Sequence, residues 1–247
     1  MRNYNVYLKG MEKGNSEKLF FLDLIDLNNF DLIIDFGCGK GDILKACKSA
    51  DGKHRTLIGI DHDPVMREIA EKNVPTAYFY DSLAMVAHLP LDGSPLLDEK
   101  TLIIFSSVLH EVEDDWTEIE KYLKGTGATV VVRDMRYTGA DGNLTQTELA
   151  KVIRNSNPKM LAEFVERYGL TRRKQLCHWL LKYSYVDNWE LELKENYFSF
   201  DYKKLFALGT IAYERNYTLP FKKERVKEDY DIDLTDGTHT QLIIKLR

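Results

Sequence analysis

The stretch DLIIDFGCGKGDIL, from Asp31 to Leu44, decides the fold of this chain. It opens with the aliphatic residues 32–34, which suit a strand that is buried on both faces of a sheet. Three glycines then follow at alternate positions: Gly37, Gly39 and Gly41. Asp42 begins an apolar pattern at helical spacing. We therefore predict a strand, a glycine turn and a helix, a unit that lets a ligand approach the backbone and the helix amides.

The spacing of these glycines differs from that of a dinucleotide-binding turn, Gly-x-Gly-x-x-Gly, whose last glycine lets the helix pack on the sheet. Here Asp42 takes that last position, and the third glycine comes one residue earlier. An acid, Asp35, also precedes the first glycine by two residues. Its carboxylate would repel a pyrophosphate but could hold a cationic ammonium. This Asp-x-Gly-x-Gly-x-Gly pattern resembles motif I of the class I S-adenosylmethionine (SAM) dependent methyltransferases.

The resemblance implies an α/β, Rossmann-like fold: a doubly wound, seven-stranded sheet whose last strand is antiparallel. It also implies SAM as cofactor and transfer of the sulfonium methyl group to an acceptor. Several helical patterns between the expected strands five and six predict a helical insert. We expect four parts: an N-terminal covering helix in 1–29, a SAM-binding core in 30–136, a helical insert or lid in 137–207 that serves as substrate subdomain, and closing strands of the core in 208–247. The covering helix is predicted over Ser16–Leu27.

The cofactor residues follow the ends of the expected strands. Asp61 follows a short apolar run, 56–60, and its carboxylate offers two acceptor oxygens to the ribose hydroxyls. Asp63 is an alternative ribose ligand, although Pro64 makes it a natural helix N-cap. In the resembled family an acid after the third strand accepts from the adenine amino group. The resemblance thus assigns these residues to the cofactor: Asp35, Gly37, Gly39, Gly41, Asp61, His62, Asp81, Ser82 and Ser106.

The candidate catalytic residues follow the fourth strand, expected over 101–108. In class I folds the end of this strand faces the methyl group of SAM. His110 is therefore a candidate general base, and Glu111 either orients it or replaces it as base. The alternative is that His110 only lines the pocket. Arg133 and Asp134 end the fifth strand and are assigned to the substrate, either as a salt bridge or with Arg133 receiving an anionic group.

The insert and the region after it differ in charge from the rest of the chain. Residues 171–227 hold 12 Lys and Arg against 7 Asp and Glu, and 12 of the 28 aromatic residues. Basic and aromatic side chains together can bind single-stranded RNA. The simpler interpretation, which we favour, is that the aromatic residues at helical spacing pack inside the insert: Trp179, Tyr183 and Trp189. Three cationic groups remain as a candidate anion-binding surface: Arg172-Arg173-Lys174, Lys203-Lys204 and Lys222-Lys223-Arg225.

Composition narrows the class of protein. The chain has 247 residues, 44% hydrophobic and 30% charged, with a net charge of −5, which does not favour non-specific binding to nucleic acid. Its three cysteines have no paired spacing, which predicts neither a disulfide framework nor a structural metal and favours a cytoplasmic protein. No apolar run approaches the roughly 20 residues needed to span a membrane.

Three functions remain open. The first is a SAM-dependent methyltransferase for a small-molecule acceptor. The second is an RNA methyltransferase, for tRNA or rRNA, although the chain has neither an Asn-Pro-Pro-Tyr nor an Asp-Pro-Pro-Tyr sequence. The third is a non-catalytic SAM-binding protein. The sequence leaves the acceptor, its target atom and the oligomeric state open.

Overall fold

The structure is a computed structural model that describes residues 15–50, 54–87, 97–112 and 115–247. Its contacts divide the chain into two compact units, which are described separately below. The core unit comprises the described residues of 15–134, together with Asp201–Arg215 and Gln241–Arg247. Among the described residues, the helical unit comprises Met135–Phe200 and Asn216–Thr240.

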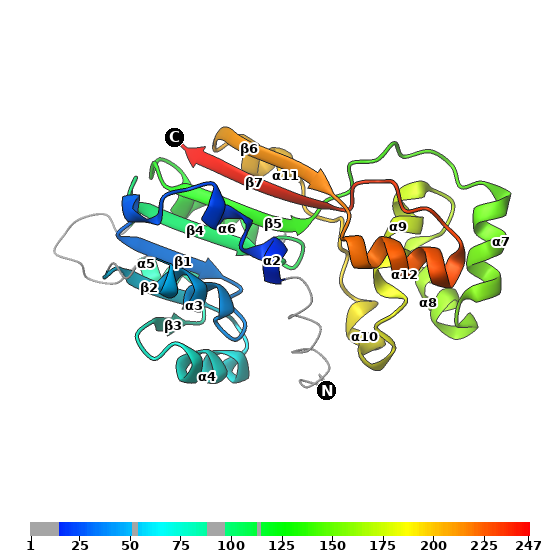
Figure 1. Cartoon of the computed structure of the whole chain (residues 1–247), viewed down its shortest axis with the longest axis horizontal. Coiled ribbons are helices and arrows are strands. Elements are labelled where there is room, and N and C mark those ends of the chain that lie inside the picture. Colours follow the sequence, from blue (N-terminus) through cyan, green and yellow to red (C-terminus); the bar gives the residue numbers. More distant parts are fainter. Residues whose placement is uncertain (1–14, 51–53, 88–96, 113–114) are drawn as a thin grey trace. The chain divides into compact units, whose positions relative to one another are not determined.

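A seven-stranded sheet forms the centre of the core unit, with strand order β3-β2-β1-β4-β5-β7-β6 (Figure 1). The strands are β1 (Leu32–Phe36), β2 (Thr56–Ile60), β3 (Tyr78–Tyr80), β4 (Thr101–Ser106), β5 (Thr129–Met135), β6 (Gly209–Tyr217) and β7 (His239–Leu246). The first five run parallel, and β7 runs opposite to both of its neighbours. Ile34 of β1 lies between Ile58 of β2 and Ile103 of β4, so the aliphatic run is the buried centre of the sheet. The predicted doubly wound fold is confirmed.

Helices cover both faces of this sheet. They are α3 (Asp42–Ser49), α4 (Pro64–Asn73), α5 (Leu83–Ala87), α6 (Trp116–Leu123) and the short α11 (Tyr202–Phe206). On one face Ile43, Leu44 and Cys47 of α3 join Ile33 and Ile104 in an apolar cluster. We call this the α3 face. On the other, the α6 face, the ring of Trp116 lies 6.2 Å from that of Phe105. Burying each large side chain in such clusters stabilises the fold by about 1.5–3 kcal/mol.

The N-terminal segment of the core unit is not the single helix expected over 16–27. It consists of α2 (Asn15–Lys18) and two 3-10 turns, η1 (Phe20–Asp23) and η2 (Leu27–Asn29). Phe21 and Leu27 are both buried in the cluster on the α3 face. The Asp26 carboxylate accepts the amide of Asn28 at 2.9 Å and so starts a new turn. Burial of both apolar residues on the sheet thus prevails over the helical pattern.

The helical unit contains α7 (Gln146–Asn155), α8 (Pro158–Tyr168), α9 (Arg173–Lys182), η3 (Val186–Asn188), α10 (Trp189–Glu192) and α12 (Pro220–Tyr230). Thr145 and Glu148 have the sequence spacing that predicts a capping box, and this box is present at the start of α7. Trp179 and Trp189 lie in the apolar cluster of this unit, with Tyr183 packed against it, as the packing interpretation predicted. The sequence predicts a fourth helix of the insert from Asp187 to about Tyr197, but α10 is shorter, and α12 was not predicted.

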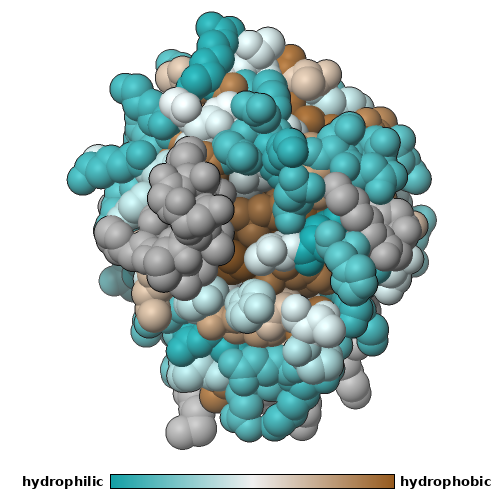
Figure 2. Space-filling model, turned by 90° about the vertical axis from the view of Figure 1, so that its left-hand side faces the viewer, coloured by the Kyte–Doolittle hydropathy of each residue, from teal (hydrophilic) through white to brown (hydrophobic). Residues whose placement is uncertain are grey.

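The parallel strands begin at the left of Figure 1 and end toward its centre. Figure 2 looks at the end where they begin, and apolar side chains are visible there in a hollow between hydrophilic ones. The candidate site residues instead follow the carboxyl ends of the strands. Among the described residues, every helix is too short or too polar to cross a bilayer.

The contact between β1, β2 and β3 requires a glycine at position 59. A Cβ atom on Gly59 would lie 2.6 Å from the Phe79 ring and 2.8 Å from Cys38 Sγ. Gly59→Ala should therefore lower the free energy of unfolding by about 1–3 kcal/mol, the usual penalty of overpacking. Urea unfolding measures it. Gly142→Ala is the matched control, because no atom of the described residues lies within 4 Å of a Cβ there. Equal unfolding midpoints for the two variants would contradict this packing.

Candidate cofactor and catalytic site

The carboxyl ends of five parallel strands bring the predicted site residues to one edge of the sheet. Asp61 and Asp81 follow β2 and β3, whose last residues, Ile60 and Tyr80, are paired. Ser106 ends β4 and pairs with Arg133 of β5. In open α/β sheets, ligands bind at this edge, beside the strand where the order reverses, which here is β1.

The glycine turn after β1 has the backbone geometry that only glycine adopts easily. Gly37, Gly39 and Gly41 have φ angles of 74°, 51° and 82°. The amide of Gly37 donates to Ile60 O at 2.7 Å, which ties the turn to the end of β2. A Cβ atom on Gly37 would come within 2.7 Å of Val108 Cγ2. At Gly37 the turn therefore leaves no room for a side chain, and its three positive φ angles favour glycine.

Asp61 is joined to this turn. Its Oδ2 accepts the amide of Gly39 at 2.8 Å, and its Oδ1 accepts the amide of Asp63 at 2.9 Å. Each carboxylate oxygen keeps a second lone pair, so both can still accept from a ligand. Asp63 itself caps α4 by accepting the amide of Val65 at 2.9 Å, as Pro64 led us to expect. The geometry thus leaves Asp61, rather than Asp63, as the residue at the turn.

The other predicted cofactor residues lie along the same edge. His62 and Asp81 are exposed, and Ser82 is half-buried at the start of α5. The hydroxyl of Ser106 is buried and has no hydrogen-bond partner among the described residues. Ser106 lies on the α3 face, because Phe105 before it points to the α6 face.

Asp35 is the most unusual residue of the edge. It is 1% exposed, and neither of its carboxylate oxygens has a hydrogen-bond partner among the described residues. Burial raises the pKa of Asp35 from its ordinary 3.8 to about 7, partly offset by nearby Lys18 and reinforced by Asp61 and Asp42. Its side chain shares the α3 face with Ile33, two residues earlier. A buried carboxylate without a donor is costly, and a cationic ligand group would satisfy it.

His110 is held by the second buried acid of the edge, Asp134. The imidazole Nδ1 lies 2.8 Å from Asp134 Oδ1, and the amides of Leu109 and His110 approach Asp134 Oδ2 at 2.5 and 3.3 Å. With an ionised Asp134 accepting, Nδ1 carries the proton and Nε2 is left as the basic nitrogen. Nε2 lies 3.8 Å from Glu111 Oε1. The two predicted catalytic residues and Asp134 are therefore adjacent.

Arg133 and Asp134 lie inside β5 rather than after it, because the strand extends to Met135. Neighbouring residues of a strand point to opposite faces. Asp134 thus contacts His110, whereas the Arg133 guanidinium donates to Ser107 Oγ at 2.6 Å. Ser107 has a positive φ of 61°, and this bend ends β4 two residues earlier than predicted.

The candidate anion-binding surface is largely engaged within the chain. Arg173 forms ion pairs with Glu148 and Asp236, and Arg172 lies 3.5 Å from Asp141. Several others also contact protein oxygens: Lys174 with Phe198 O, Lys222 with Leu181 O and Arg225 with Asp229. Few of these cations are therefore available to a polyanion.

Sequence analysis missed two residues at this edge. Lys18 lies near Asp35 and Arg133, and burial, then Arg133, lowers its pKa to about 8. It belongs to the segment for which one long helix was expected, and no sequence pattern indicated that it lies at the site. No sequence pattern predicts the bend at Ser107 either, because serine rarely adopts a positive φ.

Comparisons with known proteins agree with this geometry. Residues 34–131 match the family model described as "Methyltransferase domain". No curated protein sequence matches the chain. The fold is similar to that of the MccD protein, with 9% identity, a TM-score of 0.50 and coverage of 92% of this chain and 94% of the other.

Two further solved structures have the same fold. The plantazolicin methyltransferase BamL, in complex with a desmethylPZN analog and SAH, has 11% identity, a TM-score of 0.50 and coverage of 95% and 85%. An O-methyltransferase family protein from Burkholderia thailandensis has 12% identity, a TM-score of 0.50 and coverage of 98% and 59%. Residues 34–131 thus match a methyltransferase-domain model, and the chain has the fold of these solved structures.

Proposed function

We propose that the protein transfers the methyl group of SAM to a small-molecule acceptor. The observation that supports this best is the buried carboxylate of Asp35 beside the glycine turn, which has no hydrogen-bond partner in the part of the chain that the structure describes. SAM has an α-ammonium group, and an ammonium can donate to both oxygens of this carboxylate. A dinucleotide would instead place a pyrophosphate at the turn, where Asp35 would repel it.

The remaining edge residues suit the other parts of SAM. The free lone pairs of Asp61 would accept the ribose hydroxyls, with His62 beside it. Asp81 and Ser82 would take the adenine, and Ser106 has a free hydroxyl next to the turn. Gly37, Gly39 and Gly41 would let the cofactor approach the backbone. When bound, SAM supplies an electrophilic methyl group on a sulfonium.

The chain's own contribution to the reaction is positioning and removal of a proton. We assign the role of general base to His110, because Asp134 holds its Nδ1 and leaves Nε2 to accept the acceptor's proton. Glu111, 3.8 Å from Nε2, would stabilise the protonated imidazole. Asp134 is completely buried and acts through His110. Arg133 is the candidate for an anionic group of the acceptor.

A small molecule fits the surface better than RNA does. The aromatic residues of the insert are packed in the core of the helical unit, and most of its basic groups contact protein oxygens. We propose that the helical unit contributes to acceptor recognition. The three cysteines are free and buried, which agrees with the cytoplasmic location that we propose. A non-catalytic protein would bind SAM but show no turnover with any acceptor.

Cofactor binding should depend on Asp61. Asp61→Ala removes two charge-assisted bonds to the ribose, worth about 1.5–3 kcal/mol each, and should weaken binding of SAH, the demethylated product, at least tenfold. Isothermal titration calorimetry with SAH measures this. Asp63→Ala is the matched control, because it removes a neighbouring carboxylate that caps α4. Unchanged SAH affinity in Asp61→Ala would remove Asp61 from the site, and preference for NADH over SAH would refute the cofactor assignment.

Without cofactor, the stability of the protein should depend on pH through the ionisation of Asp35. Its pKa is about 7 when folded and near 3.8 when unfolded, so between these values the folded state binds more protons. The free energy of unfolding therefore falls as pH rises through this window. Asp35→Asn removes the ionisation and should be more stable than wild type at pH 8, with little difference at pH 4. Parallel pH profiles of urea unfolding for the two proteins would rule out the buried, unpartnered carboxylate.

Turnover should depend on His110. Loss of a general base lowers the rate by about 10²–10⁴, so His110→Ala should do so while SAH affinity stays close to that of wild type. Transfer of labelled methyl from SAM to the best acceptor of a small-molecule screen measures the rate. Glu111→Gln is the comparison. If His110→Ala loses SAH binding together with rate, the residue is a pocket wall.

A further inference from the structure

The chain leaves β4 at Ser107, whose backbone conformation is unfavourable for serine. Its φ of 61° lies in the left-handed region, where the Cβ atom comes close to the following carbonyl oxygen. An extended φ at this position would continue β4 instead of turning the chain toward Asp134. The bend thus brings the amide of Leu109 to Asp134 Oδ2 and the imidazole of His110 to Asp134 Oδ1.

Arg133 of β5 contacts Ser107 through both its backbone and its side chain. The amide of Ser107 donates to Arg133 O at 2.7 Å, one residue beyond the pair that Ser106 forms with Arg133. The guanidinium of Arg133, which is buried, donates to Ser107 Oγ at 2.6 Å. A hydrogen bond from a charged donor is stronger than one between neutral groups. It can therefore offset the cost of the left-handed conformation.

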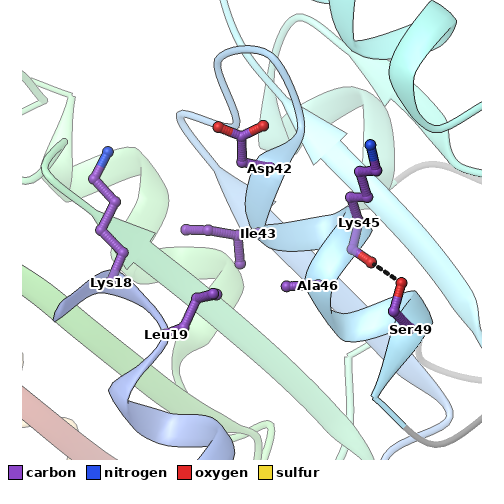
Figure 3. A pocket seen from close by; sticks show the side chains of 7 residues that line it. All are labelled: Lys18, Leu19, Asp42, Ile43, Lys45, Ala46 and Ser49. Atoms are coloured by element: carbon purple, nitrogen blue, oxygen red, sulfur yellow. Dashed lines mark hydrogen bonds between the residues drawn. The ribbon is translucent and has the colours of Figure 1, made fainter. Parts of the chain in front are cut away.

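A second cation favours this position of the guanidinium. Lys18 lines a hollow of about 280 Å³ at the start of α3, and Figure 3 shows its ammonium on the same side of the hollow as the Asp42 carboxylate. Burial, and then the nearby charge of Arg133, lowers the pKa of Lys18 to about 8. Because the two cations repel each other, the guanidinium is favoured where an oxygen accepts from it, and the Ser107 hydroxyl is such an oxygen.

Two consecutive residues of β5 thus hold the segment after β4 from opposite faces of the sheet. Arg133 holds its first residue, Ser107, on the α3 face. Asp134 holds His110 on the α6 face. The direction in which the imidazole points therefore depends on the backbone conformation at position 107.

We propose that Ser107, held by Arg133, is a positioning residue that orients His110 for removal of the acceptor's proton. The inference rests on the proposed function, in which His110 is the general base. The reaction then requires the left-handed backbone at position 107, and the hydroxyl serves to stabilise it. Substitution of Ser107 separates this role from contact between Arg133 and the acceptor.

The first measurement is the rate of methyl transfer. Ser107→Ala removes the hydroxyl but keeps a Cβ atom at the positive φ, so the bend should relax. The value of kcat should then fall about a hundredfold, the effect that a misplacement of about 1 Å can have, while SAH affinity stays close to that of wild type. Ser107→Gly should restore most of kcat, because glycine adopts a positive φ without help from a hydroxyl.

A double variant tests whether Ser107 acts through His110. Residues that act as a unit have non-additive effects on rate. The variant with both Ser107→Ala and His110→Ala should therefore be no slower than His110→Ala alone.

The second measurement needs no acceptor. In the free protein, the Nδ1 proton of His110 lies between the imidazole and the buried carboxylate of Asp134. Its NMR resonance should therefore be shifted downfield and protected from exchange with water. His110→Ala identifies the resonance by removing it. The resonance should shift or disappear in Ser107→Ala and should remain in Ser107→Gly.

Three results would overturn the role of Ser107. One is a Ser107→Ala variant that keeps either the kcat or the His110 resonance of wild type. Another is an equal loss in Ser107→Ala and Ser107→Gly, which would exclude the backbone conformation as the cause. The third is additive losses in the double variant, which would mean that Ser107 only supports the fold. If wild type methylates no acceptor, the proposed function fails, and the His110 resonance alone decides whether Ser107 positions the imidazole.

Discussion

The burial of Asp35 is the constraint on which the rest of the site depends. A carboxylate at the centre of the sheet loses its hydration, and no donor among the described residues replaces the water. The apo protein pays for this in stability, because Asp35 must be protonated or stay charged without a partner. The ammonium group of a ligand would pair with this carboxylate, so the free energy lost on folding would be regained on binding. The glycine turn, Asp61 and Lys18 surround the point where this occurs.

Asp134, the second buried acid of the edge, differs from Asp35 in its hydrogen-bond partners. Asp134 is as inaccessible as Asp35, yet its carboxylate contacts two amides and an imidazole. It points to the α6 face, whereas Asp35 points to the α3 face. One buried carboxylate is thus satisfied by the protein and fastens the turn after β4, and the other is left for a ligand. Asp134 therefore supports the structure of the site, whereas Asp35 is left to bind a ligand.

Local patterns predicted the strands and the helix caps well, since each depends on a few consecutive residues. Asp63-Pro64 and the Thr145/Glu148 capping box are examples. The features that were not predicted from the sequence depend on partners far away along the chain. The segment 16–27 follows the burial of its apolar side chains on the sheet, and α12 has only Lys222, Val226 and Tyr230 buried, too weak a pattern to notice. Asp134 contacts His110, which lies 24 residues earlier in the chain. Lys18 becomes a candidate site residue only because the fold places it near Asp35.

Proton release on cofactor binding tests the account most directly. Near pH 6 the free protein should hold Asp35 mostly protonated, because its pKa is about 7, while Lys18, with a pKa of about 8, stays charged. The ammonium of SAH should lower the pKa of Asp35, so binding should release up to about one proton. Calorimetry of SAH binding in buffers with different ionisation enthalpies measures that number. We expect release in wild type and none in Asp35→Asn; SAH binding by wild type without proton release would contradict the role of Asp35.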